Sequence, residues 1–384
     1  MGLVGAVQFV NIVDFMMVMP LGPDFAKALG VHVDKIGIVG GAYTLAAGLA
    51  GVVASPLLDR VDRRVALAIC MAGLAVGTGL GGFAQGLPSL VAARLVAGAF
   101  GGPATSVALA IVADVIPTER RGRAMAAVMT AFSVASVAGV PAGLALAGWA
   151  GWRAPFFVLS VGGAAITALS VALLPALRGH LVGATERPGM LALLRLPAAW
   201  AGLSATALVT LSGFMMIPNL SAFLQFNLGW PRADLPVLYV LGGASTLVAL
   251  QLFGRFADRT GPVPLNVAGT LAFAAVGALW FGFSPPPVPV WLLFPGMMLA
   301  MSARNVAHQS VLSQVAPAPV RAAFQSMNSS VQHISAAFAA FLGTAVLSTA
   351  ADGKLVGMPT LAAMALGCAV GVPWLLSVAL RRSR

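Results

Sequence analysis

Charged residues are scarce in this sequence of 384 residues. Asp, Glu, Lys and Arg together make up 9% of the chain, whereas 59% of it is hydrophobic. A soluble domain of this size usually carries about 25% charged residues. The chain therefore cannot cover a water-exposed surface with polar groups, which excludes an ordinary soluble protein and makes the lipid bilayer part of its solvent.

Cysteine and histidine are also rare, with two and four copies. Cys70 and Cys368 both fall inside apolar segments, and neither a His/Cys ligand spacing nor a Gly-rich phosphate loop after a strand occurs. These absences argue against a disulfide framework and a metal site. We therefore expect no cofactor and no enzymatic activity.

Long apolar runs follow one another along the whole chain. A membrane-spanning helix needs about 20 such residues. No Lys or Arg precedes the first run and no small-residue cleavage site follows it, so we expect a span there and not a signal peptide. The sequence predicts an all-α integral membrane protein with twelve transmembrane helices, at 3–22, 36–58, 65–84, 88–112, 124–147, 155–176, 198–224, 235–256, 263–283, 289–312, 322–348 and 358–380.

The net charge of +11 lies mostly on one side of these spans. Fifteen cationic residues fall in one set of alternate loops, namely Arg60, Arg63, Arg64, Arg120, Arg121, Arg123, Arg178, Arg187, Arg195, Arg255, Arg259, Arg321, Arg381, Arg382 and Arg384. The other set holds Lys27, Lys35, Arg153, Arg232 and Lys354. Cytoplasmic loops carry the excess of Lys and Arg. We therefore predict a cell (inner) membrane protein with both termini in the cytoplasm and no nucleic-acid partner.

Three landmarks recur at nearly one spacing. The triplet at Phe15 returns at Phe214, and the loop around Asp59 returns around Asp258, each 199 residues later, while Pro117 and Pro317 are 200 apart. Such a repeat predicts two pseudo-symmetric six-helix bundles, at 1–176 and 197–384, joined by a cytoplasmic linker at 177–196. Parallel six-span repeats are an architecture of secondary transporters, which bind substrate between the repeats near the midplane.

Several motifs carry a family resemblance over nearly the whole chain. They are "SPLLDRVDRR" between spans two and three with its second copy "GRFADRTGP", "LVAARLVAGAFGG" on span four, "AGVPAGLALAG" on span five and "GWRAPF" before span six. Ser55 and Asp62 stand where the first motif usually has glycine. The chain resembles a major facilitator superfamily transporter, and in particular the twelve-span drug/proton antiporters.

The resemblance implies roles for two groups of residues. In the family the loop between spans two and three is a gate, which implies that role for Asp59 and Arg63 and, in the second copy, for Asp258 and Arg259. Ordinary topology-determining charge is the alternative. The motif with Gly139, Pro141 and Gly143 is associated with antiporters. A proline kink with close helix approach at the glycines, serving packing alone, explains the same residues.

Of the 11 acidic residues, Asp14 alone lies well inside a predicted span. A charged Asp at the centre of a membrane helix costs roughly 2.5–3.5 kcal/mol, and burial disfavours the ionised carboxyl group. We therefore predict that Asp14 is the main protonation site, with Arg94 within reach of it. A structural, hydrogen-bonded pair is the alternative. The second copy has Gly213 in place of Asp14, which suggests that proton coupling is needed in one half only.

Other polar, methionine and aromatic residues in the spans are candidates for a substrate cavity. Methionine adapts its shape and suits promiscuous binding. Packing, a hydrogen-bonded histidine, or Arg304 extending toward the cytoplasmic surface are the alternatives. The candidates are Asn11, Phe15, Met16, Met215, Asn219, Arg304, His308, Asn328 and Gln332.

Two transport functions fit these residues. One is proton-coupled efflux of lipophilic small molecules or drugs by alternating access, supported by Asp14 and the span-five motif. The other is proton-coupled transport of a polar metabolite such as a sugar or organic anion, which Arg94, Arg304 and the histidines could bind. A non-transporting membrane sensor fits a duplicated transporter scaffold least well. The expected partners are a small molecule, protons and the bilayer, and we expect a monomer.

Overall fold

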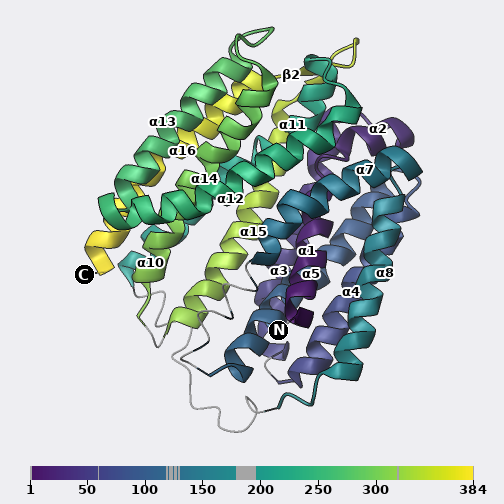
Figure 1. The fold of residues 1–384 in the computed structure, drawn as a ribbon, viewed down its shortest axis with the longest axis vertical. Helices are drawn as coiled ribbons and strands as arrows, with labels where there is room; N and C mark the ends of the chain where they lie inside the picture. The colour runs from purple at the N-terminus through teal and green to yellow at the C-terminus, as the bar shows by residue number, and fades with distance from the viewer. Residues whose placement is uncertain are drawn as a thin grey trace. The chain divides into compact units, whose positions relative to one another are not determined.

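A computed structural model describes residues 2–58, 60–117, 120, 124, 128, 130–178, 196–317 and 320–383, without the side chains of residues 55–57, 321 and 322. These residues are nearly all helical, as the sequence predicts (Figure 1). One short antiparallel hairpin, β1 (Ser348–Thr349) with β2 (Leu355–Val356), was not predicted. The chain divides into two compact units, Met1–Thr185 and Glu186–Arg384.

The N-terminal unit holds six predicted spans. Its helices are α1 (Gly2–Met17), α2 (Gly22–Leu29), α3 (Ile36–Leu58), α4 (Arg63–Gly82), α5 (Leu87–Val115), α7 (Val140–Ala150) and α8 (Ala154–Leu173). A 3-10 turn, η1 (Val33–Lys35), precedes α3, and a π-helical turn, η2 (Ala135–Gly139), runs directly into α7.

The C-terminal unit repeats the pattern. Its helices are α10 (Pro197–Phe214), α11 (Ile217–Ala222), α12 (Leu235–Thr260), α13 (Pro262–Phe281), α14 (Val290–Val315), α15 (Arg321–Val346) and α16 (Met358–Ser383). A π-helical turn, η4 (Phe223–Asn227), extends α11, and a 3-10 turn, η5 (Arg232–Asp234), precedes α12.

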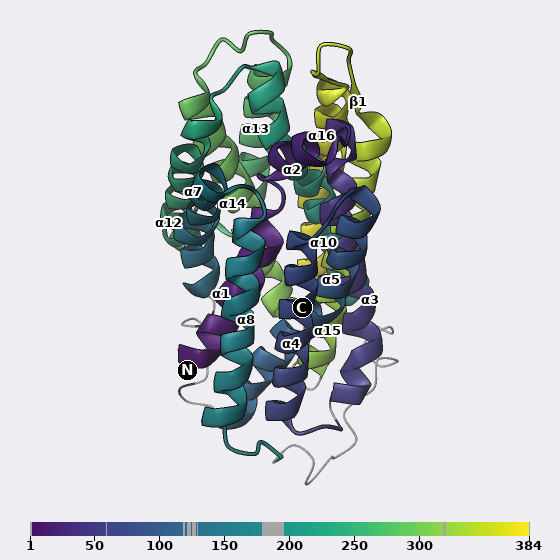
Figure 2. The same ribbon diagram turned by 90° about the vertical axis from the view of Figure 1, so that its right-hand side faces the viewer.

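The described helices account for the twelve predicted spans. Ten segments are long and apolar enough to cross a membrane, and α1 with α2 forms an eleventh that is bent by 58° (Figure 2). The twelfth is α15, whose 26 residues are made less apolar by Asn328, Gln332 and His333. The prediction of an all-α, twelve-helix, two-bundle membrane protein is confirmed.

The first and seventh spans are interrupted, which the sequence analysis did not predict. Both copies of the Phe-Met-Met triplet lie at the break: α1 ends at Met17 and α10 ends at Phe214. A proline follows each triplet, Pro20 in the first copy and Pro218 in the second. Proline cannot donate a backbone hydrogen bond and clashes with the preceding turn. The repeated triplet is therefore a repeated helix break.

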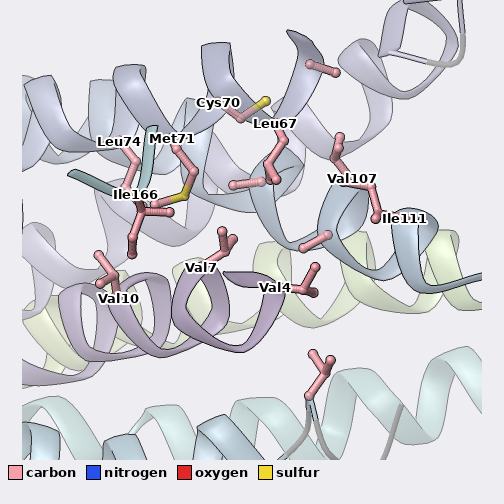
Figure 3. Packing of buried hydrophobic residues seen from close by; sticks show 14 of the residues in the cluster. Val4, Val7, Val10, Leu67, Cys70, Met71, Leu74, Val107, Ile111 and Ile166 are labelled. Carbon is pink, nitrogen blue, oxygen red and sulfur yellow. The ribbon is translucent and has the colours of Figure 1, made fainter. Parts of the chain in front are cut away.

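The core of the N-terminal unit orients α1. Val4, Val7 and Val10 are buried in one cluster with side chains of α4, α5 and α8, among them Leu67 and Ile166 (Figure 3). Residues three or four positions apart lie on one face of a helix, so the three valines share a face with residues 11 and 14. Burying the valines thus also turns Asn11 and Asp14 into the unit.

Candidate functional site

A buried ion pair joins α1 to α5 in the N-terminal unit. Nη1 of Arg94 donates to both carboxylate oxygens of Asp14 at 3.0 Å, and its Nη2 donates to the backbone carbonyl of Asp14 at 3.3 Å. The hydroxyl of Thr78, on α4, donates to Oδ1 of Asp14 at 2.8 Å. Asp14 and Arg94 are both 0% exposed. The two residues predicted to act together are therefore direct partners.

Glycines bring α5 close to α4 and to α3. A Cβ on Gly77 of α4 would overlap the backbone of Ala97 on α5, and one on Gly98 of α5 would overlap the carbonyl of Tyr43 on α3. Only glycine permits such close backbone approach. Thr78 is next to Gly77 in the chain, and Arg94 lies one helical turn before Gly98. The tight crossings therefore fix the helices that carry Thr78, Arg94 and Tyr43 against one another.

A chain of neutral polar groups continues from the ion pair. The Arg94 guanidinium lies 4.5 Å from the centre of the Tyr43 ring, a favourable cation–π contact. The Tyr43 hydroxyl donates to Oδ1 of Asn11 at 2.7 Å. Nδ2 of Asn11 donates to the Gly101 carbonyl at 2.7 Å and to the Thr105 hydroxyl at 2.6 Å.

The Thr105 hydroxyl in turn donates to Oε1 of Gln8 at 3.3 Å. Phe15, another residue predicted for the substrate cavity, stacks on Tyr43 with ring centres 5.4 Å apart. Among the described residues, Nε of Arg94 and Nε2 of Gln8 are buried without a hydrogen-bond partner. These two N–H donors could therefore form hydrogen bonds in an alternative arrangement of the network.

The glycine–proline motif of span five packs against the helix that carries Asp14. A Cβ on Gly139 would overlap Val13 and lie 3.3 Å from Phe9. One on Gly143 would lie 3.5 Å from Sδ of Met17. Pro141 is buried in the first turn of α7, after the π-helical turn η2. Met16 is half-buried, and its sulfur lies 3.8 Å from the Ser136 hydroxyl of η2.

The loop between α3 and α4 is only partly described, because Asp59 lies outside the described residues. Arg63 is buried and donates from Nε to Oδ2 of Asp114, on α5, at 3.2 Å. In the second copy, Asp258 and Arg259 are exposed in the last turn of α12.

Asp62 replaces the glycine usual in this loop motif and has a defined structural role. It caps α4 by accepting from the Arg64 amide at 2.9 Å, and it also accepts from the Leu177 amide at 3.0 Å and from Nε of Arg178 at 3.2 Å. Burial by itself favours the neutral acid, but the hydrogen bonds from Leu177, Arg64 and Arg178 outweigh it and lower the pKa of Asp62.

The polar candidates of the C-terminal unit form a second buried group. Nη2 of Arg304, on α14, donates to the Ser212 hydroxyl of α10 at 2.7 Å, and its guanidinium lies 4.9 Å from the Phe273 ring centre. His308, one turn further along α14, pairs through Nε2 with the Thr206 hydroxyl at 2.9 Å. That hydroxyl also bonds to Oδ1 of Asn328 on α15.

The remaining cavity candidates lie elsewhere in this unit. Met215 and Asn219 are buried at the break in span seven, where Nδ2 of Asn219 donates to the Met215 carbonyl at 3.2 Å. Gln332 is exposed on α15.

Sequence reasoning missed Tyr43, Thr78, Ser212 and Thr206, although each contacts a predicted residue. Tyrosine is scarce in the chain, with two copies, so Tyr43 in an apolar segment was a usable signal. Threonine and serine are common inside membrane helices because they can bond to their own backbone. Nothing in the sequence singles out Thr78 or Ser212.

Comparison with known proteins identifies the family. The family model of the Major Facilitator Superfamily matches residues 4–340. The chain belongs to this superfamily. It is 30% identical to a chloramphenicol resistance protein of Streptomyces lividans over 318 residues, which is 80% of this chain and 79% of that one. It is 26% identical to the inner membrane transport protein YdhP of Escherichia coli (strain K12), over 66% of this chain and 63% of that one.

Solved superfamily structures share the fold. A D-xylose–proton symporter matches with a TM-score of 0.74 at 17% identity, covering 96% of this chain and 95% of that one. The nucleoside transporter NupG matches with a TM-score of 0.75 at 13% identity, covering 98% and 99%. This major facilitator superfamily member is thus a multi-pass membrane transporter of small molecules.

Proposed function

We propose that this transporter exports lipophilic small molecules by alternating access, driven by proton entry, and that it works as a monomer in the cell membrane with both termini in the cytoplasm. The observation that carries the proposal is the Asp14–Arg94 ion pair. It is fully buried, and Asp14 is the one acidic residue well inside a predicted span. An ionisable residue in that position is costly and usually functional.

Protonation of Asp14 would change the contacts that hold α1. The ionised carboxylate accepts from Nη1 of Arg94 and from Thr78. A neutral carboxyl group is a weaker acceptor and has a proton to donate, so the bond to Arg94 weakens and the Thr78 hydroxyl can become the acceptor. Arg94 keeps the Tyr43 ring and the Asp14 carbonyl as partners. The guanidinium therefore stays stabilised while the proton is bound.

The span-five motif is placed to respond to this change. Gly139 and Gly143 contact Val13 and Met17, on either side of Asp14 in the sequence. The packing is tight at Gly139, so a shift of α1 of a few tenths of an ångström would change this contact. We propose that Gly139, Pro141 and Gly143 form the seam that couples protonation to movement of the helix. Asp59 and Arg63, with Asp258 and Arg259 in the second copy, are proposed as the cytoplasmic gate.

The substrate class rests on a relative and on the lining residues. The relative from Streptomyces lividans is named for chloramphenicol resistance. The Phe-Met-Met breaks of both units supply aromatic and thioether surface, which adapts to varied apolar ligands. We propose that Phe15, Met16, Met215 and Asn219 contact the substrate, with Asn11, His308, Asn328 and Gln332 supplying polar contacts. Chloramphenicol is the first compound to test.

The test is uptake of labelled chloramphenicol into vesicles that contain purified protein and an imposed pH gradient. Wild type should accumulate the compound against its gradient. Asp14→Asn keeps the shape of the side chain but cannot ionise, so it should bind the compound and equilibrate it without accumulating it. The matched control is Asp24→Asn, in α2. Uphill transport by Asp14→Asn at the wild-type rate would place the proton elsewhere, with His308 and His333 next in line.

The second candidate function is proton-coupled transport of a polar metabolite, and Arg304 is the observation that favours it. A buried guanidinium held by a hydroxyl and an aromatic ring can bind an organic anion. The same vesicles separate the two functions. Proton movement on addition of organic anions or sugars, with none on addition of lipophilic drugs, would replace the efflux proposal.

A further inference from the structure

The C-terminal unit buries a cation without a carboxylate. Arg304 is 1% exposed. Asp234, Asp258 and Asp352 are the acidic residues of this unit that the structure describes, and none of them pairs with Arg304. The positive charge is therefore uncompensated within the described part of the chain.

In the N-terminal unit the buried arginine, Arg94, has a carboxylate partner in Asp14. In each unit an arginine on the fourth predicted span reaches the first one: Arg94 of α5 reaches Asp14 of α1, and Arg304 of α14 reaches Ser212 of α10. At the repeat spacing of 199 residues, Ser212 falls one position before the counterpart of Asp14. The two arginines are not repeat counterparts, since Arg304 falls at the position of Thr105, but one unit supplies a carboxylate to its arginine and the other supplies a hydroxyl.

Ser212 cannot supply the missing charge. Its hydroxyl accepts from Nη2 of Arg304 at 2.7 Å and donates to the Val209 carbonyl at 2.8 Å. A buried charge that is paired only with neutral groups remains costly, and breaking an ion pair by removing one member typically costs several kcal/mol. A negatively charged ligand at Arg304 would remove that cost.

Unused polar groups gather on the helix facing Arg304. Asn266, Gly269, Thr270 and Phe273 lie on one face of α13, and a Cβ on Gly269 would lie 2.9 Å from Cγ of Arg304. Within the described residues, Nε of Arg304 and Oγ1 of Thr270 are buried without a hydrogen-bond partner. These are groups that can donate to an anion.

A cavity adjoins the ring that covers Arg304. Phe273, whose ring lies over the guanidinium, also lines a cavity of about 220 Å³ between α13 and α16, together with Met216, Met297 and Leu366. Its lining side chains are apolar, and neither Arg304 nor Thr270 is among them. A ligand in this cavity is therefore separated from the guanidinium by the Phe273 ring.

We propose that Arg304 and Thr270 bind a singly charged anion, which takes the place in the C-terminal unit that the Asp14 carboxylate holds in the N-terminal unit. The anion is either an inorganic ion such as chloride or the carboxylate of an organic molecule. Both present a compact negative charge to a guanidinium. The site is independent of proton transport at Asp14.

The experiment measures the unfolding temperature of the purified full-length protein in detergent. Sodium chloride, or in a parallel series sodium acetate, replaces the sodium salt of the bulky sulfonate buffer HEPES at constant ionic strength. A ligand that binds only the folded state raises the unfolding temperature with its concentration above Kd. We expect such a rise with chloride if the ligand is an inorganic ion, and with acetate alone if it is a carboxylate.

Four variants test the roles of Arg304 and of the missing carboxylate. Ser212→Asp places a carboxylate at the Arg304 guanidinium, so the unfolding temperature in HEPES salt should rise and the response to added anion should disappear. Ser212→Asn adds similar volume without charge and should keep the response. Arg304→Gln should lose it, whereas Arg153→Gln, in the N-terminal unit, should keep it.

Direct binding provides a readout that does not depend on how well the variants fold. Wild-type protein should bind radioactive chloride, or radioactive acetate, in a saturable way, and excess unlabelled ion should displace it. Saturable binding of neither ion by wild type would overturn the proposal. So would an undiminished anion response in folded Arg304→Gln protein.

Discussion

At the scale of single residues, Asp14 and Arg304 illustrate two ways of keeping charge inside a membrane bundle. Asp14 is held by three donor groups from α4 and α5 and has its counter-charge in the same unit. Arg304 is held by one hydroxyl, an aromatic ring and a face of α13 with unused polar groups. We propose that the first arrangement exchanges a proton and that the second accepts an anion.

The balance of charge at Asp14 predicts non-additive stability effects. Arg94→Gln leaves the Asp14 carboxylate buried without its cation, and removing one partner of a buried pair costs about 3–5 kcal/mol. Adding Asp14→Asn removes the stranded charge, so the double variant should regain most of the lost stability. Unfolding temperatures of the two single variants and the double variant measure this coupling. A double variant as unstable as Arg94→Gln would show that the pair contributes no charge balance.

At the scale of helices, the packing of α1 against η2 and α7 is set by glycine. Gly139→Ala would force its Cβ into Val13 and should cost about 1–3 kcal/mol in stability, as overpacking of a tight core does. The pH-driven transport rate should fall as well, because Val13 is next to Asp14. Val13→Ala in the same chain makes room for the new methyl group and should restore both properties.

Gly148→Ala is the matched control for this prediction. Gly148 lies in α7, which continues directly from η2, and a Cβ there meets nothing within 4 Å. The control should keep wild-type stability and transport. Alanine has the higher helix propensity, so an equal loss in both glycine variants would mean that contact of position 139 with α1 does not cause the effect.

The cap of α4 has a predictable pH dependence. The pKa of Asp62 is lowered in the folded state, so its stabilisation is complete above the unfolded value of about 3.9 and is lost as the pH falls below it. Asp62→Ala should cost about 1 kcal/mol near pH 7, the usual cost of losing an N-cap. Denaturation of both proteins from pH 7 to pH 3 should show the difference shrinking below about pH 4. A constant difference would exclude a role for the charge.

At the scale of the whole molecule, the uneven distribution of Arg and Lys predicts the orientation. Arg187 lies outside the described residues, in the segment expected to face the cytoplasm. Arg187→Cys, in a chain with Cys70 and Cys368 changed to alanine, should resist membrane-impermeant thiol reagents in intact cells. Lys354→Cys is the control: Lys354 is exposed beside the β1–β2 hairpin, in a loop expected outside, and should react. Rapid labelling at 187 together with protection at 354 would invert the topology.

The sequence by itself determined the class of protein and the location of its unusual residues. Hydropathy and charge are properties of each segment alone, so the spans, the repeat and the isolated Asp14 could be read without a structure. The helix bounds agree closely in most cases, as at 36–58, because a span is limited by the bilayer and by turn residues that are local in the sequence.

Only the tertiary structure shows which side chains contact Asp14, Arg94 and Arg304. Whether Arg94 meets Asp14, and whether Arg304 meets a carboxylate or Ser212, depends on how far each helix is rotated and how closely the backbones approach. Gly77, Gly98 and Gly269 set that approach across segments far apart in the chain. The π-helical turn before α7 likewise packs against α1, a helix far from it in the sequence. An interaction of this kind is fixed by three-dimensional packing, and no single segment of the sequence contains it.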